Sequence, residues 1–196
     1  GTGPDVLDLD TLMIPSAIDA GLISPLDDFM SRYGITRDMF VEACYDAGVA
    51  DGKAYSVPNR FAPIALFYNK TMFDKYGLEA PKTWTELAEC SKIIHEKEGI
   101  PGFGTDSLVD TYQCLIMQAG SGYIDEDGNY AIDETIAKEK LNWFADLVKS
   151  GDFRLVGEDV FFSGPFGSQA VASYIGSSAG VSYVELAVND AFEIGC

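Results

Sequence analysis

Long apolar runs and positive charge are both scarce in this sequence. No run approaches the roughly 18 consecutive apolar residues that a membrane-spanning helix needs. No signal peptide is visible, and the chain opens on Gly1 rather than Met, so we expect a processed or trimmed product. Lys and Arg number 13 against 31 Asp and Glu, which gives a formal net charge of -18 at pH 7. A surface of this sign repels phosphate backbones and anionic lipids, so we expect no nucleic-acid binding and no peripheral membrane binding.

Side chains that bind metals or form nucleophile–base pairs are also few. His95 is the only histidine, and none of the cysteines shows CxxC spacing. The four cysteines are Cys44, Cys90, Cys114 and Cys196. We expect free buried thiols rather than a disulfide framework, a zinc site or a Cys–His catalytic pair. The stretches 102–104 and 164–167 lack a third glycine and a Walker lysine, so neither predicts a phosphate loop. The sequence therefore gives no reason to expect a metal or a cofactor.

What is present is an alternation of predicted strands and helices, which indicates an α/β protein with mainly parallel strands. The predicted strands cover residues 4–9, 52–58, 64–70, 102–106, 171–175 and 192–196. The predicted helices cover residues from 11 to 21, 37–47 after a Thr36 cap, 83–98, a segment ending near 120, 134–149, and a segment from 178 onward. A hairpin is predicted around Asp127 and Gly128. We expect strands 64–70, 102–106 and 171–175 to form one sheet, covered by helices 83–98 and 134–149.

The stretch "TWTE" at residues 83–86 has the pattern of a capping box. Thr83 can accept a hydrogen bond from the Glu86 backbone N–H, while the Glu86 side chain reaches back. Trp84 then lies on the helix stripe that carries Leu87 and Ala88. We expect Trp84 to anchor the core rather than to contact a ligand.

The stretch "GSSAG" at residues 176–180 matches the nucleophile elbow of α/β-hydrolases, between a predicted strand and a predicted helix. A hydrolase that used Ser178 would need a histidine downstream as its base, and the sequence has none. The same geometry exposes backbone N–H groups and the Ser177 and Ser178 hydroxyls, which suits a polar or anionic ligand group.

In the stretch "YSVPNRFAPIALFYNK", residues 55–70, two prolines bracket an arginine and an aromatic residue. Pro58 and Pro63 prevent a regular strand ladder, so the side chains between them are not committed to strand pairing. Phe61 could stack on the C–H face of a sugar, and Arg60 is a positive site in an acidic protein that favours an anionic or hydroxyl-rich solute. The alternative is a solvated turn.

Several segments together resemble a known family. "GPDV…AIDAGLISPLDDFM", "DGKAYSVP" and "LFYNKTMFDKYGLEAPKTWTELAE" are similar, in order and spacing, to the extracellular solute-binding proteins of family 1, the receptors of sugar ABC importers. "LVKSGDFRLVG" and "GSSAG" resemble the branch that holds glycerol-3-phosphate-binding proteins. The resemblance implies a periplasmic-binding-protein-like two-lobed α/β fold of type II, in chains roughly twice this length. It further implies an internal fragment, with residues 1–60 in the first lobe, 61–190 in the second, and 191–196 starting the return hinge crossing.

The function that the resemblance implies is a non-enzymatic receptor that binds a sugar, a sugar phosphate or a glycerol-phosphate-like solute between its lobes. Its partner would be an ABC permease, and the receptor would be a monomer that needs no cofactor. It would work outside the cytoplasm, in the periplasm or as a lipoprotein anchored at the cell surface. A serine hydrolase that uses Ser178 and a structural or adhesive surface domain stay open as alternatives.

The resemblance also implies a set of ligand-binding residues. Two acidic residues follow the predicted first strand, three residues stand at the hinge, three occupy the loop and helix start after strand 102–106, and three form the "GSS" turn. In that order they are Asp8, Asp10, Asn59, Arg60, Phe61, Asp106, Ser107, Asp110, Gly176, Ser177 and Ser178.

Overall fold

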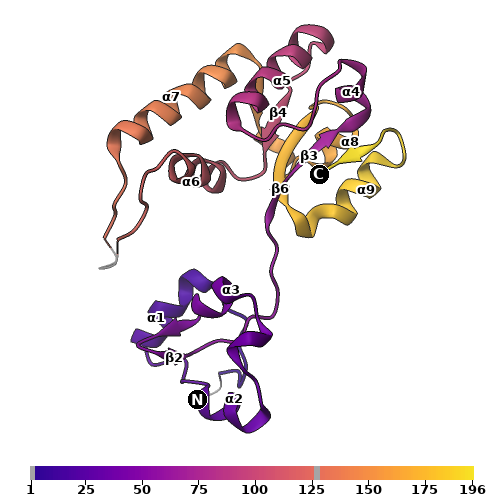
Figure 1. The fold of residues 1–196 in the computed structure, drawn as a ribbon. Coiled ribbons are helices and arrows are strands. Elements are labelled where there is room, and N and C mark those ends of the chain that lie inside the picture. Colours follow the sequence, from indigo (N-terminus) through magenta and orange to yellow (C-terminus); the bar gives the residue numbers. More distant parts are fainter. Residues whose placement is uncertain (1–2, 126–128) are drawn as a thin grey trace. The chain divides into compact units, whose positions relative to one another are not determined.

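The chain forms two compact units, Gly1–Phe61 and Ala62–Cys196 (Figure 1). The computed structural model describes residues 3–125 and 129–196. The hairpin turn predicted at Asp127 and Gly128 lies outside these residues, and the flanking Ile124 and Tyr130 form an antiparallel bridge. We call the two units unit 1 and unit 2 and describe each by itself.

Unit 1 consists of short helices and a two-stranded antiparallel sheet. The elements are η1 (Thr11–Met13), α1 (Ile14–Asp19), α2 (Asp27–Tyr33), η2 (Arg37–Met39), α3 (Glu42–Asp46), β1 (Val49–Ala50) and β2 (Lys53–Ala54). The buried apolar side chains described in this unit are those of Ile14, Ala17, Met30 and Ala54. Its core is therefore small.

Three predictions for unit 1 are wrong in detail. Residues 4–9 form no strand, because no neighbouring strand supplies the ladder hydrogen bonds that an extended segment needs. The helix predicted over 37–47 is interrupted where Phe40 and Val41 adopt extended backbone, and Thr36 makes no side-chain cap. The strand predicted over 52–58 is limited to β2, because its partner strand β1 supplies only Val49 and Ala50 for pairing.

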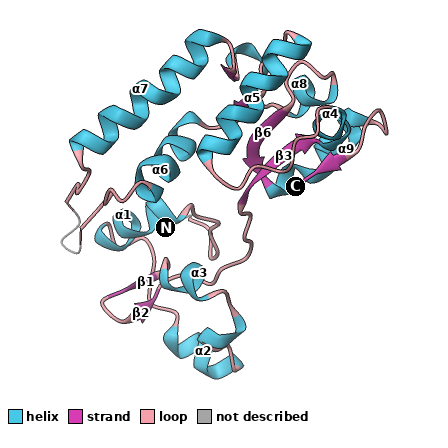
Figure 2. Ribbon diagram, turned by 45° about the horizontal axis from the view of Figure 1, so that its top comes forward, coloured by secondary structure: helices cyan, strands magenta, loops and turns pink. Residues whose placement is uncertain are grey.

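Unit 2 is built on a five-stranded sheet with the order β5-β4-β6-β3-β7. Figure 2 shows the neighbouring strands β6 and β3 of this sheet. The strands are β3 (Ile64–Asn69), β4 (Phe103–Thr105), β5 (Phe153–Leu155), β6 (Ser173–Ser177) and β7 (Ile194–Gly195). The helices are α4 (Lys70–Lys75), α5 (Trp84–Glu98), α6 (Leu108–Gln118), α7 (Glu134–Ser150), η3 (Gly157–Asp159), α8 (Ser163–Gly167), η4 (Ser178–Gly180) and α9 (Val181–Val188).

The single sheet expected for β3, β4 and β6 is confirmed, but the direction of β3 differs from the prediction. Strand β4 pairs in parallel with both β5 and β6, whereas β3 is antiparallel to both β6 and β7. The sheet is therefore mixed. Because β3 and β6 are far apart in the sequence, neither a tight hairpin nor a single crossover helix fixes their relative direction.

The sheet of unit 2 is covered on both faces. On one face, helices α5, α6 and α7 pack against β4 and β5, with the Phe103 and Phe153 rings tilted against each other at a centroid distance of 4.7 Å. This confirms the predicted positions of α5 and α7. On the other face, helices α8 and α9 bury Phe166 and Val184 against Phe67 and Tyr174. The loops at the strand ends are thus held by a packed core.

Helix α5 begins and ends close to where its sequence predicts. The Oγ1 of Thr83 accepts the Glu86 N–H at 3.1 Å, and the helix ends at Gly99, whose φ is 71°. The Glu86 carboxylate accepts from the Lys82 N–H at 2.6 Å instead of completing the capping box at Thr83. Trp84 is half-buried, edge-on to Phe103 at 6.4 Å.

Candidate functional site

The candidate residues of unit 2 meet at one edge of the sheet. Parallel strands β4 and β6 pair Thr105 with Ile175, so the chain leaves both strands at the same edge. Strand β3 begins at this edge, because Ile64 pairs with Ser177. The Ser178 N–H donates to the Pro63 carbonyl at 2.8 Å. We call residues 63–64, 106–110 and 176–178 the strand-end site.

Asp106 lies at the centre of the strand-end site. Its Oδ1 accepts the Phe162 N–H at 2.6 Å, and its own N–H donates to the Ile175 carbonyl at 3.0 Å. Partial burial raises the pKa of the Asp106 carboxyl, while the Phe162 N–H acts in the opposite direction. Asp106, which follows β4, therefore contacts both strand β6 and the segment that follows β5.

Gly176 is required by the packing around Asp106. A Cβ at this position would lie 2.5 Å from Oδ2 of Asp106 and 2.7 Å from the Tyr174 ring. Both distances are far inside van der Waals contact, so a side chain at 176 would displace the carboxylate or the ring. Because Gly176 has no side chain, its backbone can lie close to the Asp106 carboxylate within the strand-end site.

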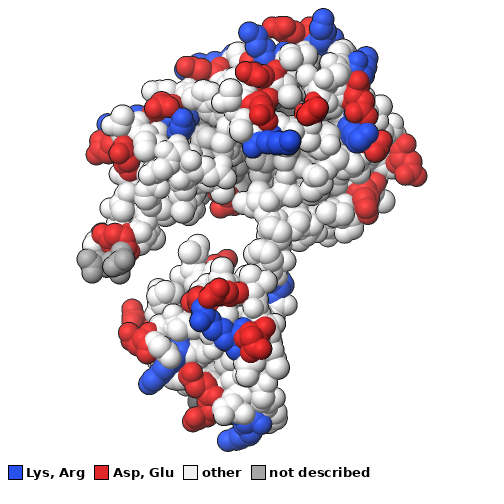
Figure 3. Space-filling view, viewed as in Figure 1, with Lys and Arg blue, Asp and Glu red and all other residues white. Residues whose placement is uncertain are grey.

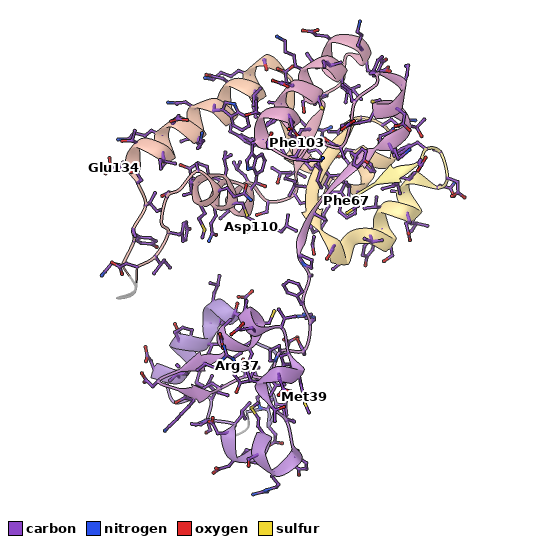
Figure 4. The ribbon with its side chains drawn as sticks, in the orientation of Figure 1. Arg37, Met39, Phe67, Phe103, Asp110 and Glu134 are labelled. Carbon is purple, nitrogen blue, oxygen red and sulfur yellow. The ribbon has the colours of Figure 1, made fainter. Side chains whose placement is uncertain are left out.

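The start of helix α6 is fixed at the same edge. The Ser107 hydroxyl caps the helix by accepting the Asp110 N–H at 3.2 Å. Thr105 and Thr111 share a buried hydroxyl–hydroxyl hydrogen bond of 2.5 Å. The Asp110 side chain is exposed, at the side of unit 2 where β3 begins (Figure 4). Ser107 is thus occupied with capping, whereas Asp110 presents its carboxylate to solvent.

The "GSS" turn presents small polar groups. Ser177 is exposed and its hydroxyl accepts the Ala179 N–H at 3.3 Å, while Ser178 is half-buried. The only histidine of the chain, His95, contacts the Ile100 carbonyl through Nδ1 at 3.2 Å, next to Gly151. Those residues precede β4 and β5, at the opposite edge of the sheet from Ser178. His95 therefore cannot act as a base for Ser178.

The remaining candidates lie in unit 1. Arg60 and Asp8 form an ion pair of 3.0 Å across 52 residues of sequence, with 77% and 58% of their side chains exposed. The positive site that the sequence predicted at Arg60 is thus partly neutralised by Asp8. Asp10 caps η1 by accepting the Leu12 N–H at 2.9 Å. Asn59 and Phe61 are exposed.

Sequence reasoning missed the segment after β5. Phe161 is 61% exposed, whereas the adjacent Phe162 is completely buried. Arg154 forms an ion pair with Asp159, and its guanidinium lies over the Phe162 ring at 5.4 Å. The two consecutive aromatic residues in "DVFFSG" are the only sequence signal, and they do not reveal which ring is exposed.

The charges on the visible surface are mixed, with acidic side chains in excess (Figure 3). All four cysteines are free, as predicted, but the prediction that they are buried holds fully only for Cys90, because Cys44 and Cys114 are half-buried and Cys196 is exposed. Within residues 3–125 and 129–196, no group of three or more His, Cys, Asp or Glu side chains could hold a metal ion. In the same part of the chain, no helix is both long enough and apolar enough to cross a membrane.

Comparison with known proteins identifies the family. The family model of the bacterial extracellular solute-binding proteins matches residues 1–192. An arabinooligosaccharide-binding protein of Halalkalibacterium halodurans is 29% identical over 154 residues, which cover 76% of this chain and 34% of that protein. The sn-glycerol-3-phosphate-binding periplasmic protein UgpB of Agrobacterium fabrum is 31% identical over 171 residues, covering 76% of this chain and 38% of that protein.

A solved structure agrees on the fold. The GacH receptor of Streptomyces glaucescens superposes with a TM-score of 0.83 at 23% identity, covering 99% of this chain and 51% of that one. The chain thus spans little more than a third of these two curated relatives and about half of the solved receptor. Its fold is the periplasmic-binding-protein-like α/β fold that the motifs implied. The chain belongs to the family of bacterial extracellular solute-binding proteins.

Proposed function

We propose that this chain is part of the substrate-binding receptor of an ABC importer and that its solute is a carbohydrate. The observation that carries the proposal is the family match over residues 1–192, with relatives named for binding arabinooligosaccharides and glycerol 3-phosphate. The relatives are binding proteins, and we propose no catalytic function and no cofactor for this chain. The receptor is a monomer that works outside the cytoplasm, in the periplasm or as a surface lipoprotein.

The chemistry of the strand-end site supports this solute class. Ligands of open α/β sheets bind outside the carboxyl ends of parallel strands, which is where β4 and β6 end. Asp110 offers an exposed carboxylate as an acceptor for sugar hydroxyls, and Ser177 offers a hydroxyl. A carboxylate repels a phosphate group at short range, so this edge favours a neutral hydroxyl-rich ligand over glycerol 3-phosphate.

The unit 1 candidates complete the proposed ligand-binding set. Arg60 donates to ligand oxygens, and the exposed Phe61 ring stacks on an apolar sugar face. Asp8 holds the Arg60 guanidinium through their ion pair. Asn59 and Asp10 are proposed as further polar contacts.

The proposed mechanism is lobe closure. Residues 1–60 belong to the first lobe, 61–190 form the second, and 191–196 begin the return crossing between them. A ligand that contacts both lobes binds the closed form more tightly, so it shifts the population toward that form, which the permease then recognises.

The test is a thermal-shift screen of the full-length receptor against sugars, sugar phosphates and polyols. A carbohydrate at one hundred times its Kd should stabilise the folded state by about 2.7 kcal/mol, a clear rise in melting temperature. If sugar phosphates alone raise the melting temperature, the protein is a solute receptor but the proposed solute class is wrong. If a well-folded protein responds to none of the compounds, the proposed function is wrong.

A further inference from the structure

The segment that follows β5 contains a strained turn centred on Val160. The φ and ψ of Val160 are 66° and -47°, and the Phe161 N–H donates to the Asp159 carbonyl, two residues earlier, at 2.7 Å. A hydrogen bond of this span, with positive φ at its central residue, defines the rare and strained form of the γ-turn. A β-branched residue adopts such a conformation only where its surroundings impose it. We call residues 159–161 the γ-turn.

The γ-turn is held by its flanks rather than by packing at its centre. Val160 and Phe161 are 64% and 61% exposed, so their side chains bury little surface that could offset the strain. On one flank, the Asp159 carboxylate forms an ion pair with Arg154 of β5. On the other flank, the Phe162 ring is completely buried. The strain at Val160 therefore persists only as long as both flanks stay in place.

The backbone of Phe162 connects the γ-turn to the strand-end site. Its N–H donates to Oδ1 of Asp106 at 2.6 Å. A hydrogen bond to an ionised carboxylate is roughly twice as strong as one to a neutral acceptor. The planar peptide group that carries this N–H also contains the Phe161 carbonyl, so the bond fixes the orientation of the residue next to Val160. This contact therefore couples the γ-turn to the charge of a group in the strand-end site.

Asp106 is the carboxyl group best placed to control the γ-turn. Partial burial raises its pKa, so it takes up a proton at a higher pH than an exposed aspartate does. Burial and the Asp106 charge both raise the pKa of Tyr174, which therefore stays neutral in the acid range. The other ionisable side chains on the elements around Asp106 are those of Asp110, Arg154 and Asp159. Arg154 does not lose its charge, so Asp110 and Asp159 are the two carboxyl groups that an experiment must separate from Asp106.

We propose that Asp106 is a pH-sensitive latch: its ionised carboxylate holds the Phe162 N–H and keeps Val160 strained, and its protonation lets the γ-turn relax. In the relaxed state Val160 returns to negative φ and the exposed Phe161 ring changes its orientation, while the Phe162 ring stays in the core. The latch acts without ligand, so it does not depend on the solute that the receptor binds.

The test is an NMR pH titration of the ligand-free, full-length receptor labelled with isotope-enriched phenylalanine. In the wild type, the amide signals of Phe161 and Phe162 should both shift as pH falls through the raised pKa of Asp106, with one common midpoint. Asp106→Asn keeps an oxygen acceptor without the charge, so both signals should stay near the acid limit of the wild type at every pH. Asp110→Asn and Asp159→Asn are the matched controls, and both should keep the midpoint of the wild type.

A glycine at the centre of the turn tests the strain separately. Glycine adopts positive φ without steric cost, so Val160→Gly leaves no strain for the latch to release. In this variant the Phe162 signal should still titrate, whereas the Phe161 signal should no longer shift with it.

Other results would contradict the latch and leave the proposed receptor function unaffected. If the Phe162 signal of the wild type titrates without that of Phe161, the hydrogen bond exists but the γ-turn does not respond to it. If Asp110→Asn or Asp159→Asn abolishes the shift, another carboxyl group controls the turn. If neither signal moves over the pH range in which the protein stays folded, the charge of Asp106 does not control the γ-turn.

Discussion

At the scale of single residues, the strand-end site depends on a glycine that only the structure explains. The sequence places Gly176 in a turn, but its importance comes from Asp106, 70 positions earlier in the numbering. We predict that Gly176→Ala lowers the free energy of unfolding by about 1–3 kcal/mol, because the new Cβ would lie 2.5 Å from Oδ2 of Asp106. Gly180→Ala is the matched control, since no atom lies within 4 Å of its added Cβ. If the two variants have equal denaturation midpoints, the strand-end site accommodates the added Cβ without losing stability, which would contradict the prediction.

Asp106 also makes stability depend on pH. Its pKa is raised in the folded protein, mainly by burial, so the folded state holds its proton at a higher pH than the unfolded state. The contribution of Asp106 to the free energy of unfolding is therefore greatest at low pH. It falls as pH rises from the unfolded pKa through the raised folded pKa. Asp106→Asn keeps an acceptor for Phe162 and removes the charge. As pH rises from the unfolded pKa through the raised folded pKa, the denaturation midpoint of this variant should increase relative to that of the wild type. A difference that is independent of pH would contradict the assignment.

Substitution of Arg60 is predicted to change ligand affinity but not stability. Its ion pair with Asp8 is exposed, and exposed pairs contribute about 0–1 kcal/mol, so Arg60→Ala should barely change the unfolding free energy of the full-length receptor. As a proposed ligand contact, the same change should weaken carbohydrate affinity about ten- to a hundredfold. Phe61→Ala should also weaken it. If calorimetry gives the wild-type affinity for both variants, the segment connects the units and does not contact ligand.

At the scale of elements, the contribution of Trp84 in helix α5 to the core can be tested by substitution. The ring is half-buried, packs edge-on against Phe103 and donates to Gln118 at 2.7 Å. We predict that Trp84→Ala lowers the free energy of unfolding by an amount near the lower end of about 3–5 kcal/mol. Carbohydrate affinity should not change in the protein that remains folded. A variant with normal stability and lost binding would place Trp84 at the ligand instead.

Some elements could be predicted from the sequence, and others could not. Helices α5 and α7 were predictable, because Thr83 and Asp133 cap their first turns and Gly99 and Gly151 end them with left-handed backbone. The direction of β3 was not, since it depends on pairing with the distant β6. In unit 1 the predicted helix over residues 37–47 failed where Phe40 left the helix and its ring stacked on Tyr45 at 6.0 Å.

The candidate site was predictable to a similar degree. The family motifs and the strand order were enough to propose residues 106–110 and 176–178. The exposed Phe161 was not predictable, because Phe162 rather than Phe161 packs its ring against Tyr174 in the core, and Tyr174 lies in a different element, strand β6. The partial neutralisation of Arg60 by Asp8 also depends on a contact across 52 positions, which no local pattern reveals.

At the scale of the whole molecule, the two units differ in how much core each contains. The buried apolar residues described in unit 1 are Ile14, Ala17, Met30 and Ala54, whereas unit 2 holds three clusters around its sheet. A small domain needs most of its apolar surface buried to offset chain entropy. We therefore predict that residues 62–196 expressed alone melt cooperatively by circular dichroism, whereas residues 1–61 alone do not. A cooperative transition for 1–61 would contradict this view.

The central claim is that the chain belongs to a carbohydrate receptor whose ligand contacts the strand-end site. The most direct measurement is titration calorimetry of the full-length receptor, and of its Asp110→Asn/Ser177→Ala double variant, with the carbohydrate that the thermal-shift screen identifies. We predict saturable binding to the wild type at one site. The double variant, which loses a charged acceptor and a hydroxyl, should bind about ten- to a hundredfold more weakly at unchanged stability. If the variant binds as tightly as the wild type, the ligand does not contact the strand-end site, and the account is wrong.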